Sequence, residues 1–484
     1  MLKQVFRDSL IYSLASVMTR GLAILLLPIY TRVLSTAEYG AYDIIITVGA
    51  LANVIVALEV SQGYARLQAD VDSVERKQLA STALLFILLV YGIFIGICFG
   101  FQSVLNGWFL GDARLLPAFR WGVLFIAANG VYVFLLSQLR WGLKSREYAV
   151  ASVLFALVTF VVAAFLCMFL DFGLSGVVIA QLTAAISGAI CCLVFSRESF
   201  RVYFSAPKLL AMLHFSVPLV PASLAVFANL YASRVALKHF ASLEDVGLYG
   251  IASRLGGASL LLVVGIQAAL MPLVYREYKD PKTPKQIARL LHGFLAIVLP
   301  GCLGLSVFAP EILRIFTTPD YYPAAPLIAF LAPAILASQL YVFAPGMAIK
   351  KKTHWQLFAT LTAAFISIAG NWLLVPQLGA VGAAVTLILS TGTFLIVWMS
   401  FSQYLYPIPF SYSRISGGVA AYVLLAYAGW VVSNFGLSLV WLISSKSALL
   451  VLMLLIVIRL GLLDKQQLKQ IVEKAKRFIE GKAA

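Results

Sequence analysis

The sequence predicts an all-α polytopic membrane protein, with fourteen transmembrane helices arranged as two parallel six-helix repeats around a central cavity, plus two extra C-terminal helices. Three observations predict this class. The composition is 62% hydrophobic and 12% charged, which excludes an ordinary soluble domain. Apolar stretches of about 20 residues, enough to cross a bilayer core of roughly 30 Å, recur from Ser9 to Leu463. One motif also occurs twice, 207 positions apart.

The apolar stretches lack the two-residue alternation of a membrane barrel. We therefore expect helices, because a spanning segment must satisfy its own backbone hydrogen bonds. The predicted helices are 9–33, 40–64, 79–101, 118–138, 148–170, 174–195, 209–233, 247–272, 290–309, 323–345, 355–376, 379–402, 414–432 and 441–463. The predicted domains are an N-lobe (1–200), a C-lobe (201–403), the last two helices (404–463) and a cytoplasmic amphipathic tail (464–484).

Most of the 36 basic residues fall on alternate connections, together with the N-terminus and the tail. Basic loops stay in the cytoplasm, so both termini are predicted to be cytoplasmic. The net charge of +16 is spread over many loops rather than one face, which favours contact with membrane lipids over nucleic acid. The five cysteines lie in apolar helices, and their spacing predicts neither a metal site nor disulfides.

The repeated motif is S-x-x-[DE]-x-G-x-Y-x-I, at Ser35–Ile44 and again at Ser242–Ile251. A second pair, Gly173–Gly176 and Gly379–Gly382, follows at nearly the same offset. Each repeat holds an even number of helices, so both copies insert the same way up, about an axis along the membrane normal. This arrangement is typical of transporters whose lobes expose a cavity to alternate sides.

Three segments resemble a known family: L-P-I-Y-T-R-V-L-S-T-A-E-Y-G (27–40), V-G-L-Y-G (246–250) and N-W-L-L-V-P-Q-L-G-A-V-G-A-A (371–384). They are similar to the polysaccharide transporter branch of the multidrug/oligosaccharidyl-lipid/polysaccharide exporter superfamily, such as Wzx-type O-antigen flippases. The resemblance implies transfer of undecaprenyl-pyrophosphate-linked oligosaccharide across the bacterial cytoplasmic (inner) membrane. Relatives often have an acidic residue before the arginine that ends helix seven, where this chain has Ser233-Arg234.

The candidate headgroup-binding residues are Arg20, Arg254, Arg234 and Arg32, because a guanidinium fork suits phosphate oxygens. An arginine at mid-membrane is costly unless it faces water, an anion or a partner. The alternative for Arg20 is an ion pair with Asp43 or Glu59. For Arg254 the alternative is snorkelling to the interface, and Arg32 and Arg234 are predicted at outer helix ends, where interfacial anchoring is the alternative.

Other polar residues within the spans have weaker assignments. Asp43 and Glu59 are candidates for proton or ion coupling or for ion pairs with arginine, and Asn53 and Asn229 for sugar contacts or helix-to-helix hydrogen bonds. Lys446 is expected to snorkel. The prolines that interrupt the first helix of each repeat, as gating bends or simple kinks, are Pro28, Pro218 and Pro221.

We therefore predict a flippase for an O-antigen or exopolysaccharide repeat unit, working by alternating access. A lipid II flippase for peptidoglycan synthesis ranks second, and a multidrug or cation antiporter third. Catalysis is not expected, because the longer loops carry no catalytic grouping. No cofactor is expected beyond a coupling H⁺ or Na⁺. The expected partners are the lipid-linked glycan, membrane lipids, a polysaccharide polymerase and glycosyltransferases.

Overall fold

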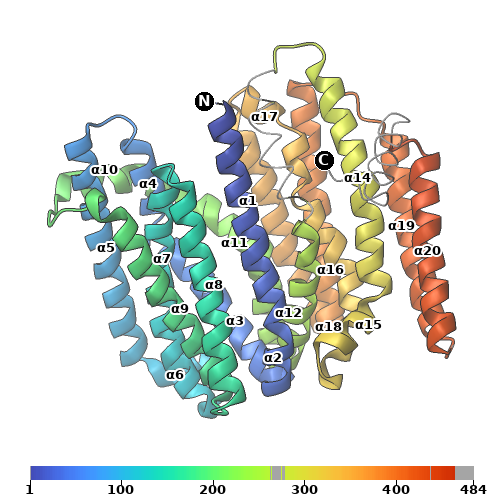
Figure 1. Cartoon of the computed structure of the whole chain (residues 1–484), viewed down its shortest axis with the longest axis horizontal. Helices are drawn as coiled ribbons and strands as arrows, with labels where there is room; N and C mark the ends of the chain where they lie inside the picture. The colour runs from blue at the N-terminus through green and yellow to red at the C-terminus, as the bar shows by residue number, and fades with distance from the viewer. Residues whose placement is uncertain (1, 262, 264–273, 275–277, 437, 464–484) are drawn as a thin grey trace, which may run out of the picture.

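The computed structural model describes residues 2–261, 263, 274, 278–436 and 438–463 of the chain. These residues form a bundle of helices and contain no strand (Figure 1). The predicted all-helical class is confirmed. The amphipathic tail predicted for 464–484 lies outside the described residues, as do 264–272 of the eighth predicted helix.

We use the name N-lobe for the helices of residues 2–199, which occupy the left and centre of Figure 1. Its elements are α1 (Leu2–Leu25), α2 (Leu27–Val33), α3 (Thr36–Ile55), α4 (Val60–Leu67), α5 (Ser73–Gly100), α6 (Gln102–Phe109), η1 (Ala113–Leu115), α7 (Leu116–Trp141), α8 (Ser145–Met168), α9 (Gly173–Ser196) and η2 (Arg197–Ser199).

We use the name C-lobe for the helices between residues 206 and 405; together with the C-terminal pair, most of them are on the right of Figure 1, but the first is at the upper left. They are α10 (Ala206–Ser216), η3 (Val217–Leu219), α11 (Val220–Phe240), α12 (Leu243–Gly256), η4 (Gly257–Leu260), α14 (Thr283–Val307), α15 (Ala309–Phe316), η5 (Pro319–Ala324), α16 (Ala325–Ala337), η6 (Leu340–Phe343), α17 (Gly346–Ile349), α18 (Thr353–Leu405), α19 (Tyr412–Ser433) and α20 (Leu439–Arg459).

Among the described residues, 11 helices are long and apolar enough to cross a membrane, or 12 if the bent pair α3 and α4 is one span. The predicted number was fourteen. Two features account for the difference. The eighth predicted helix runs from α12 into undescribed residues, and α18 contains both the eleventh and the twelfth, interrupted at Gly379 (φ 53°, ψ −133°). A helix of 53 residues would measure roughly 80 Å, too long for one crossing.

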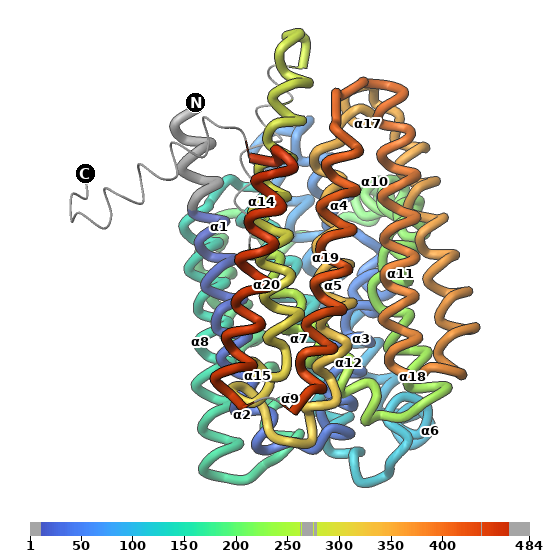
Figure 2. The backbone as a smooth tube through the Cα atoms, turned by 90° about the vertical axis from the view of Figure 1, so that its right-hand side faces the viewer, coloured from blue at the N-terminus to red at the C-terminus, as the bar shows by residue number. Residues whose placement is uncertain are grey.

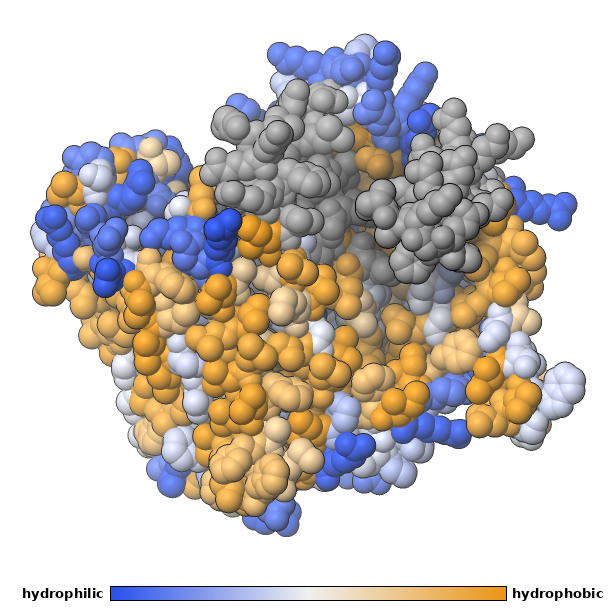
Figure 3. All heavy atoms as spheres, viewed as in Figure 1, coloured by the Kyte–Doolittle hydropathy of each residue, from blue (hydrophilic) through white to orange (hydrophobic). Residues whose placement is uncertain are grey.

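Apolar side chains cover the middle of the outer surface, and hydrophilic residues gather at its two ends (Figure 3). Large exposed residues on this belt include Phe101, Phe165, Phe365, Leu424 and Leu455. In water so large an apolar surface would drive aggregation. It is the surface expected of a protein whose middle section is surrounded by lipid.

The start of each repeat's second helix is fixed by local hydrogen bonds. The Ser35 side chain accepts from the backbone N–H of Glu38, and the Glu38 carboxylate accepts from the backbone N–H of Ser35. The Ser242 hydroxyl likewise accepts from the N–H of Asp245. Such caps satisfy the free amides of a first turn. Both helices therefore begin four residues earlier than predicted, at Thr36 and Leu243.

The prolines of the first and seventh predicted helices do coincide with breaks. Pro28 lies in the first turn of α2, directly after the break at Leu26 that separates it from α1. Pro218 lies in η3 between α10 and α11, and Pro221 lies in the first turn of α11. Each proline therefore lies at or beside an interruption of the regular α-helix, since proline lacks the N–H that continues a helix. Their role in gating stays a prediction.

The last two spanning helices, α19 and α20, pack against each other and against α14 (Figure 2). Tyr422 on α19 forms hydrogen bonds with the hydroxyl of Ser306 on α14 (2.8 Å) and the carbonyl of Ala329 on α16 (2.9 Å). Arg414 donates to the carbonyl of Gly461, which follows α20 (2.9 Å). This pair is therefore attached to the C-lobe.

The two lobes meet where α3 crosses α12, and this contact uses both copies of the repeated motif. A Cβ atom on Gly40 would overlap with the carbonyl of Leu243 and lie 3.1 Å from the N of Gly247. A Cβ atom on Gly247 would overlap with the carbonyl of Thr36 and lie 3.2 Å from the N of Gly40. The glycines thus let two backbones touch reciprocally.

We name the end of the bundle that holds this crossing, α2 and η5 the closed end; it is at the bottom of Figure 1. The hydroxyl of Thr318 donates to the carbonyl of Thr31 (3.1 Å), and that of Tyr321 donates to the carbonyl of Leu34 (2.8 Å). At the opposite end α10 packs against α4 and α5 of the N-lobe, and Lys208 lies 3.5 Å from Glu75. The chain begins at that opposite end.

We expect Gly40→Ala and Gly247→Ala each to destabilise the closed arrangement, because the added methyl meets backbone rather than a movable side chain. Overpacking of this kind costs about 1–3 kcal/mol. Gly392→Ala is the matched control, because nothing lies within 4 Å of its Cβ position inside α18 and alanine favours helix. The measurement is the thermal unfolding midpoint in nanodiscs. Equal midpoints for all three variants would contradict the crossing.

Candidate functional site

An ion pair joins the lobes beside the glycine crossing. The Nε of Arg234, on α11, donates to Oδ2 of Asp43, on α3, at 2.6 Å, and both side chains are largely buried. Gly250 makes room for this carboxylate, because a Cβ there would lie 3.1 Å from it. Arg234 also lies over the rings of Tyr231 and Tyr249, at 5.3 and 5.4 Å. The acidic partner of Arg234 is therefore Asp43 of the N-lobe, and not the residue that precedes Arg234 in its own helix.

This position corrects the expectation that Arg234 sits at an outer helix end. The predicted helix ended at residue 233, whereas α11 continues to Phe240. Arg234 therefore lies about 9 Å inside the helix end, and its contacts are with protein rather than with the lipid interface.

Arg254 lies on α12 against the tyrosines of α3. Its guanidinium is 5.7 Å from the ring centroid of Tyr39 and 5.6 Å from that of Tyr42, within the range of cation–π attraction. Because α12 starts at Leu243, Arg254 is about 17 Å from the helix start, deeper than predicted. It faces the N-lobe instead of snorkelling, and no described carboxylate lies within ion-pair distance of it.

The tyrosines form a cluster at the lobe interface that the sequence did not reveal. The ring centroids of Tyr39 and Tyr42 are 5.9 Å apart, those of Tyr30 and Tyr42 5.6 Å, and those of Tyr39 and Tyr321 6.0 Å. Gln181 donates to the hydroxyl of Tyr42 at 2.9 Å. The buried hydroxyls of Tyr30 and Tyr39 have no hydrogen-bond partner among the described residues. The cluster therefore offers a cation and unused hydroxyl donors.

Arg20 and Arg32 lie apart from this cluster in the contacts they make. Arg20 is half-buried on α1, which packs mainly against α8, and it makes no ion pair with a described residue. Its predicted alternative pairing with Asp43 is wrong, because Asp43 pairs with Arg234. Arg32 is exposed near the end of α2. Glu59 is the αL residue before α4 (φ 53°), and it too has no ion pair within the described chain.

The two candidate sugar contacts differ. Oδ1 of Asn53 accepts a hydrogen bond from Tyr91 of α5 at 2.8 Å, so this side chain links two helices of the N-lobe. The Oδ1 of Asn229, on α11, is buried and lacks a partner in the described structure. Buried amide oxygens are normally hydrogen-bonded. Asn229 is therefore the one of the two that retains an unused acceptor.

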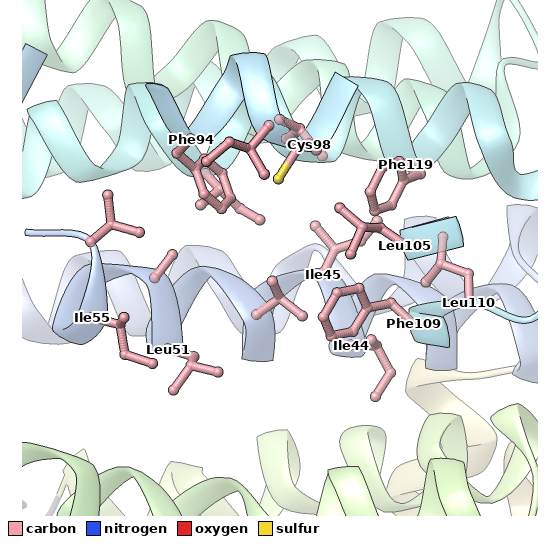
Figure 4. A pocket seen from close by; sticks show the side chains of 17 residues that line it. Ile44, Ile45, Leu51, Ile55, Phe94, Cys98, Leu105, Phe109, Leu110 and Phe119 are labelled. Atoms are coloured by element: carbon pink, nitrogen blue, oxygen red, sulfur yellow. The ribbon is translucent and has the colours of Figure 1, made fainter. Parts of the chain in front are cut away.

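A separate cavity of about 300 Å³ lies within the N-lobe, between α3, α5, α6 and α7 (Figure 4). Its lining is apolar, with Leu51 and Ile55 from α3, Phe94 and Cys98 from α5, and Phe109 from α6. It offers no charged or hydrogen-bonding side chain, so it does not suit an ionic headgroup. Arg234 and Arg254 lie instead where the lobes meet. No group of three or more potential metal ligands occurs in the described residues.

The model of the family described as "Polysaccharide biosynthesis protein" matches residues 5–277. The chain belongs to this family. The match covers nearly all of the N-lobe and the first helices of the C-lobe, which together contain Arg20, Asp43, Arg234 and Arg254. No curated protein matches the sequence.

Solved structures share the fold at low sequence identity. A lipid II flippase MurJ in an inward closed conformation is 15% identical, with a TM-score of 0.75 over 93% of this chain and 98% of that one. An inward-facing multidrug resistance MATE family transporter of the MOP superfamily is 15% identical, with a TM-score of 0.62 over 80% and 94%. A Vibrio cholerae MATE transporter, VcmN in the bent form, is 15% identical, with a TM-score of 0.53 over 84% of this chain and 98% of that one. Family and fold together place the chain in the MOP exporter superfamily.

Removing either partner of the Asp43–Arg234 pair should weaken the closed arrangement, because it leaves the other charge buried and unpaired, at about 3–5 kcal/mol. We expect Asp43→Asn and Arg234→Gln each to lower the thermal midpoint and the swap Asp43→Arg/Arg234→Asp to recover part of the loss. Arg66→Gln, which removes an exposed pair with Asp70, is the control. Additive effects in the double variant would show that the two residues do not interact.

Proposed function

We propose that the protein is a flippase that moves an undecaprenyl-pyrophosphate-linked oligosaccharide, an O-antigen or exopolysaccharide repeat unit, from the inner to the outer leaflet of the bacterial cytoplasmic membrane. The observation that carries the proposal is the unbalanced positive charge within the spans. Arg254 and Arg20 have no described carboxylate partner, in a chain that belongs to a polysaccharide biosynthesis family.

A pyrophosphate headgroup matches this charge. Each guanidinium has five N–H donors, and an arginine that uses none of them on a carboxylate can offer a fork to phosphate oxygens. Arg234 differs, because Asp43 occupies its Nε and the carbonyl of Leu230 occupies its Nη1. We therefore assign the headgroup to Arg20 and Arg254, and Arg234 to holding the lobes together. Asn229 supplies a free acceptor for a sugar hydroxyl.

The basic loops orient the protein. They lie at the end of the bundle where the chain begins, opposite the closed end, so the positive-inside rule puts that end and both termini in the cytoplasm. The closed end then faces outward. In this arrangement the headgroup enters from the inner leaflet while its polyprenyl tail stays in lipid. Fourteen spans, in two repeats of six plus α19 and α20, are consistent with this orientation.

Transport requires that the lobes exchange which end is closed. The described contacts at the closed end include the glycine crossing, the Asp43–Arg234 pair and the hydrogen bonds of Thr31, Thr318 and Tyr321. An anionic headgroup that binds Arg254 more tightly in one conformation than in the other shifts the population by that difference in affinity. The breaks at Leu26 and η3 supply bends in the first helix of each repeat.

A lipid II flippase is the second candidate, because the chain shares its fold with the MurJ structure at a TM-score of 0.75 and lipid II carries the same pyrophosphate. A cation antiporter fits less well, because Asp43 is already paired with an arginine. Coupling to H⁺ or Na⁺ is a further prediction. Glu59, at the break between α3 and α4 and without a described partner, is the better candidate for it. A polymerase and glycosyltransferases are the proposed functional partners.

The proposal is tested by transfer of labelled lipid-linked oligosaccharide across proteoliposomes. We expect Arg20→Ala and Arg254→Ala each to slow transfer about ten- to a hundredfold, because a hydrogen bond to a charged group is worth about 1.5–3 kcal/mol. Lysine at either position should restore only part of the rate, since it keeps the charge without the fork. The matched control is Arg120→Ala, an exposed arginine whose described partner is Gln102.

Two comparisons separate the candidate functions. In the first, lipid II replaces the oligosaccharide, and a faster transfer of lipid II would favour the peptidoglycan alternative. In the second, an imposed H⁺ or Na⁺ gradient tests whether transfer is coupled to that ion. Full transfer by the double variant Arg20→Ala/Arg254→Ala, at normal protein levels, would refute a cationic headgroup site.

A further inference from the structure

Lys446 occupies a place that its position on α20 did not predict. We expected it to snorkel to the membrane interface, yet its side chain is 0% exposed. Its Nζ donates to Oε1 of Glu311 at 2.7 Å and lies 5.9 Å from the ring centroid of Phe308. The snorkelling expectation is wrong because a carboxylate on a neighbouring helix reaches the ammonium within the protein.

Glu311 lies on α15, and that short helix leads directly to the closed end. The hydroxyl of Thr31, on α2 of the N-lobe, donates to the carbonyl of Phe316, the last residue of α15, at 3.2 Å. The next residues return the contact, since the hydroxyl of Thr318 donates to the carbonyl of Thr31 at 3.1 Å. One short helix thus connects an ion pair on α20 to the contact between the lobes.

Breaking the Lys446–Glu311 pair would cost free energy. A buried lysine without a partner is strongly unfavourable, and breaking a buried pair costs more than forming it gains. The second oxygen of Glu311 is buried with no hydrogen bond in the described structure, so Lys446 is the group that neutralises this carboxylate. Tyr422 binds α19 to α14 and α16, and α20 packs against α19 and α14. Lys446 therefore attaches α15 to a helix that is itself held against the C-lobe.

We infer that Lys446 is a positioning residue for the outer gate, by which we mean the contacts between the lobes at the closed end. Through Glu311 it holds α15 where Phe316 and Thr318 can meet Thr31. The C-terminal helix pair would then stabilise closure of the outer end in addition to any contact with lipid. This inference deepens the proposed function, in which the closed end faces outward. It concerns the gate and not the headgroup, so it does not depend on which lipid is carried.

Hydrogen exchange of the full-length protein in nanodiscs, without substrate, tests the inference. We expect Lys446→Met and Glu311→Gln to speed exchange about tenfold in peptides covering 309–324 and also 27–34. Tenfold corresponds to about 1.4 kcal/mol. The second peptide is decisive, because α2 belongs to the other lobe and Lys446 does not touch it. Lys446→Arg keeps the charge and should leave exchange near that of the unmodified protein.

Arg120→Met, which removes an exposed arginine of α7, is the control and should leave exchange at 27–34 unchanged. Faster exchange limited to 439–459, with 27–34 unaffected, would show that the pair only anchors α20 and would overturn the inference. Unchanged exchange in both Lys446→Met and Glu311→Gln would overturn it as well. Failure of the proposed transport, with the α2 effect present, would leave the gate role standing and remove only the substrate.

Discussion

The contact between α3 and α12 depends on two glycines, and the remaining features of the interface depend on that contact. Side chains at Gly40 and Gly247 would hold the backbones apart. At their actual separation, the Asp43 carboxylate reaches Arg234 and the rings of Tyr39 and Tyr42 reach Arg254. The two glycines occupy equivalent positions in the two repeats. Each copy of the motif therefore supplies one surface of this contact, with a glycine that accommodates the other helix.

The two arginines at this contact, Arg234 and Arg254, differ in whether a carboxylate neutralises their charge. Arg234 is neutralised by a residue of the opposite lobe, which makes it part of the contact. Arg254 is surrounded by tyrosines that attract a cation without cancelling its charge. Arg254 has no described carboxylate partner, and a cation at this depth in a membrane protein favours binding of an anion. In the proposed function, the Asp43–Arg234 contact is the part of this interface that opens and Arg254 is the group that binds a phosphate.

The sequence was sufficient to predict the all-helical membrane class and the superfamily. It misplaced the depth of Arg234 and Arg254, because hydrophobicity alone marks where lipid ends and not where a helix ends. The S-x-x-[DE] motif marks a repeat, and it is also a capping signal. As a capping signal it predicts that α3 and α12 start at Thr36 and Leu243, where the structure has them. Contacts between distant residues, such as Asp43 with Arg234 or Lys446 with Glu311, leave no comparable local signal.

The central claim is that the lobes close at one end at a time, and paired distance measurements test it most directly. Spin labels at Arg114 and Asp320, both exposed, report on the closed end, and labels at Arg76 and Lys285, also exposed, report on the opposite end. With the lipid-linked oligosaccharide added in nanodiscs, a longer distance should appear in the first pair together with a shorter one in the second. Distances that stay fixed, or that lengthen in both pairs at once, would contradict alternating access.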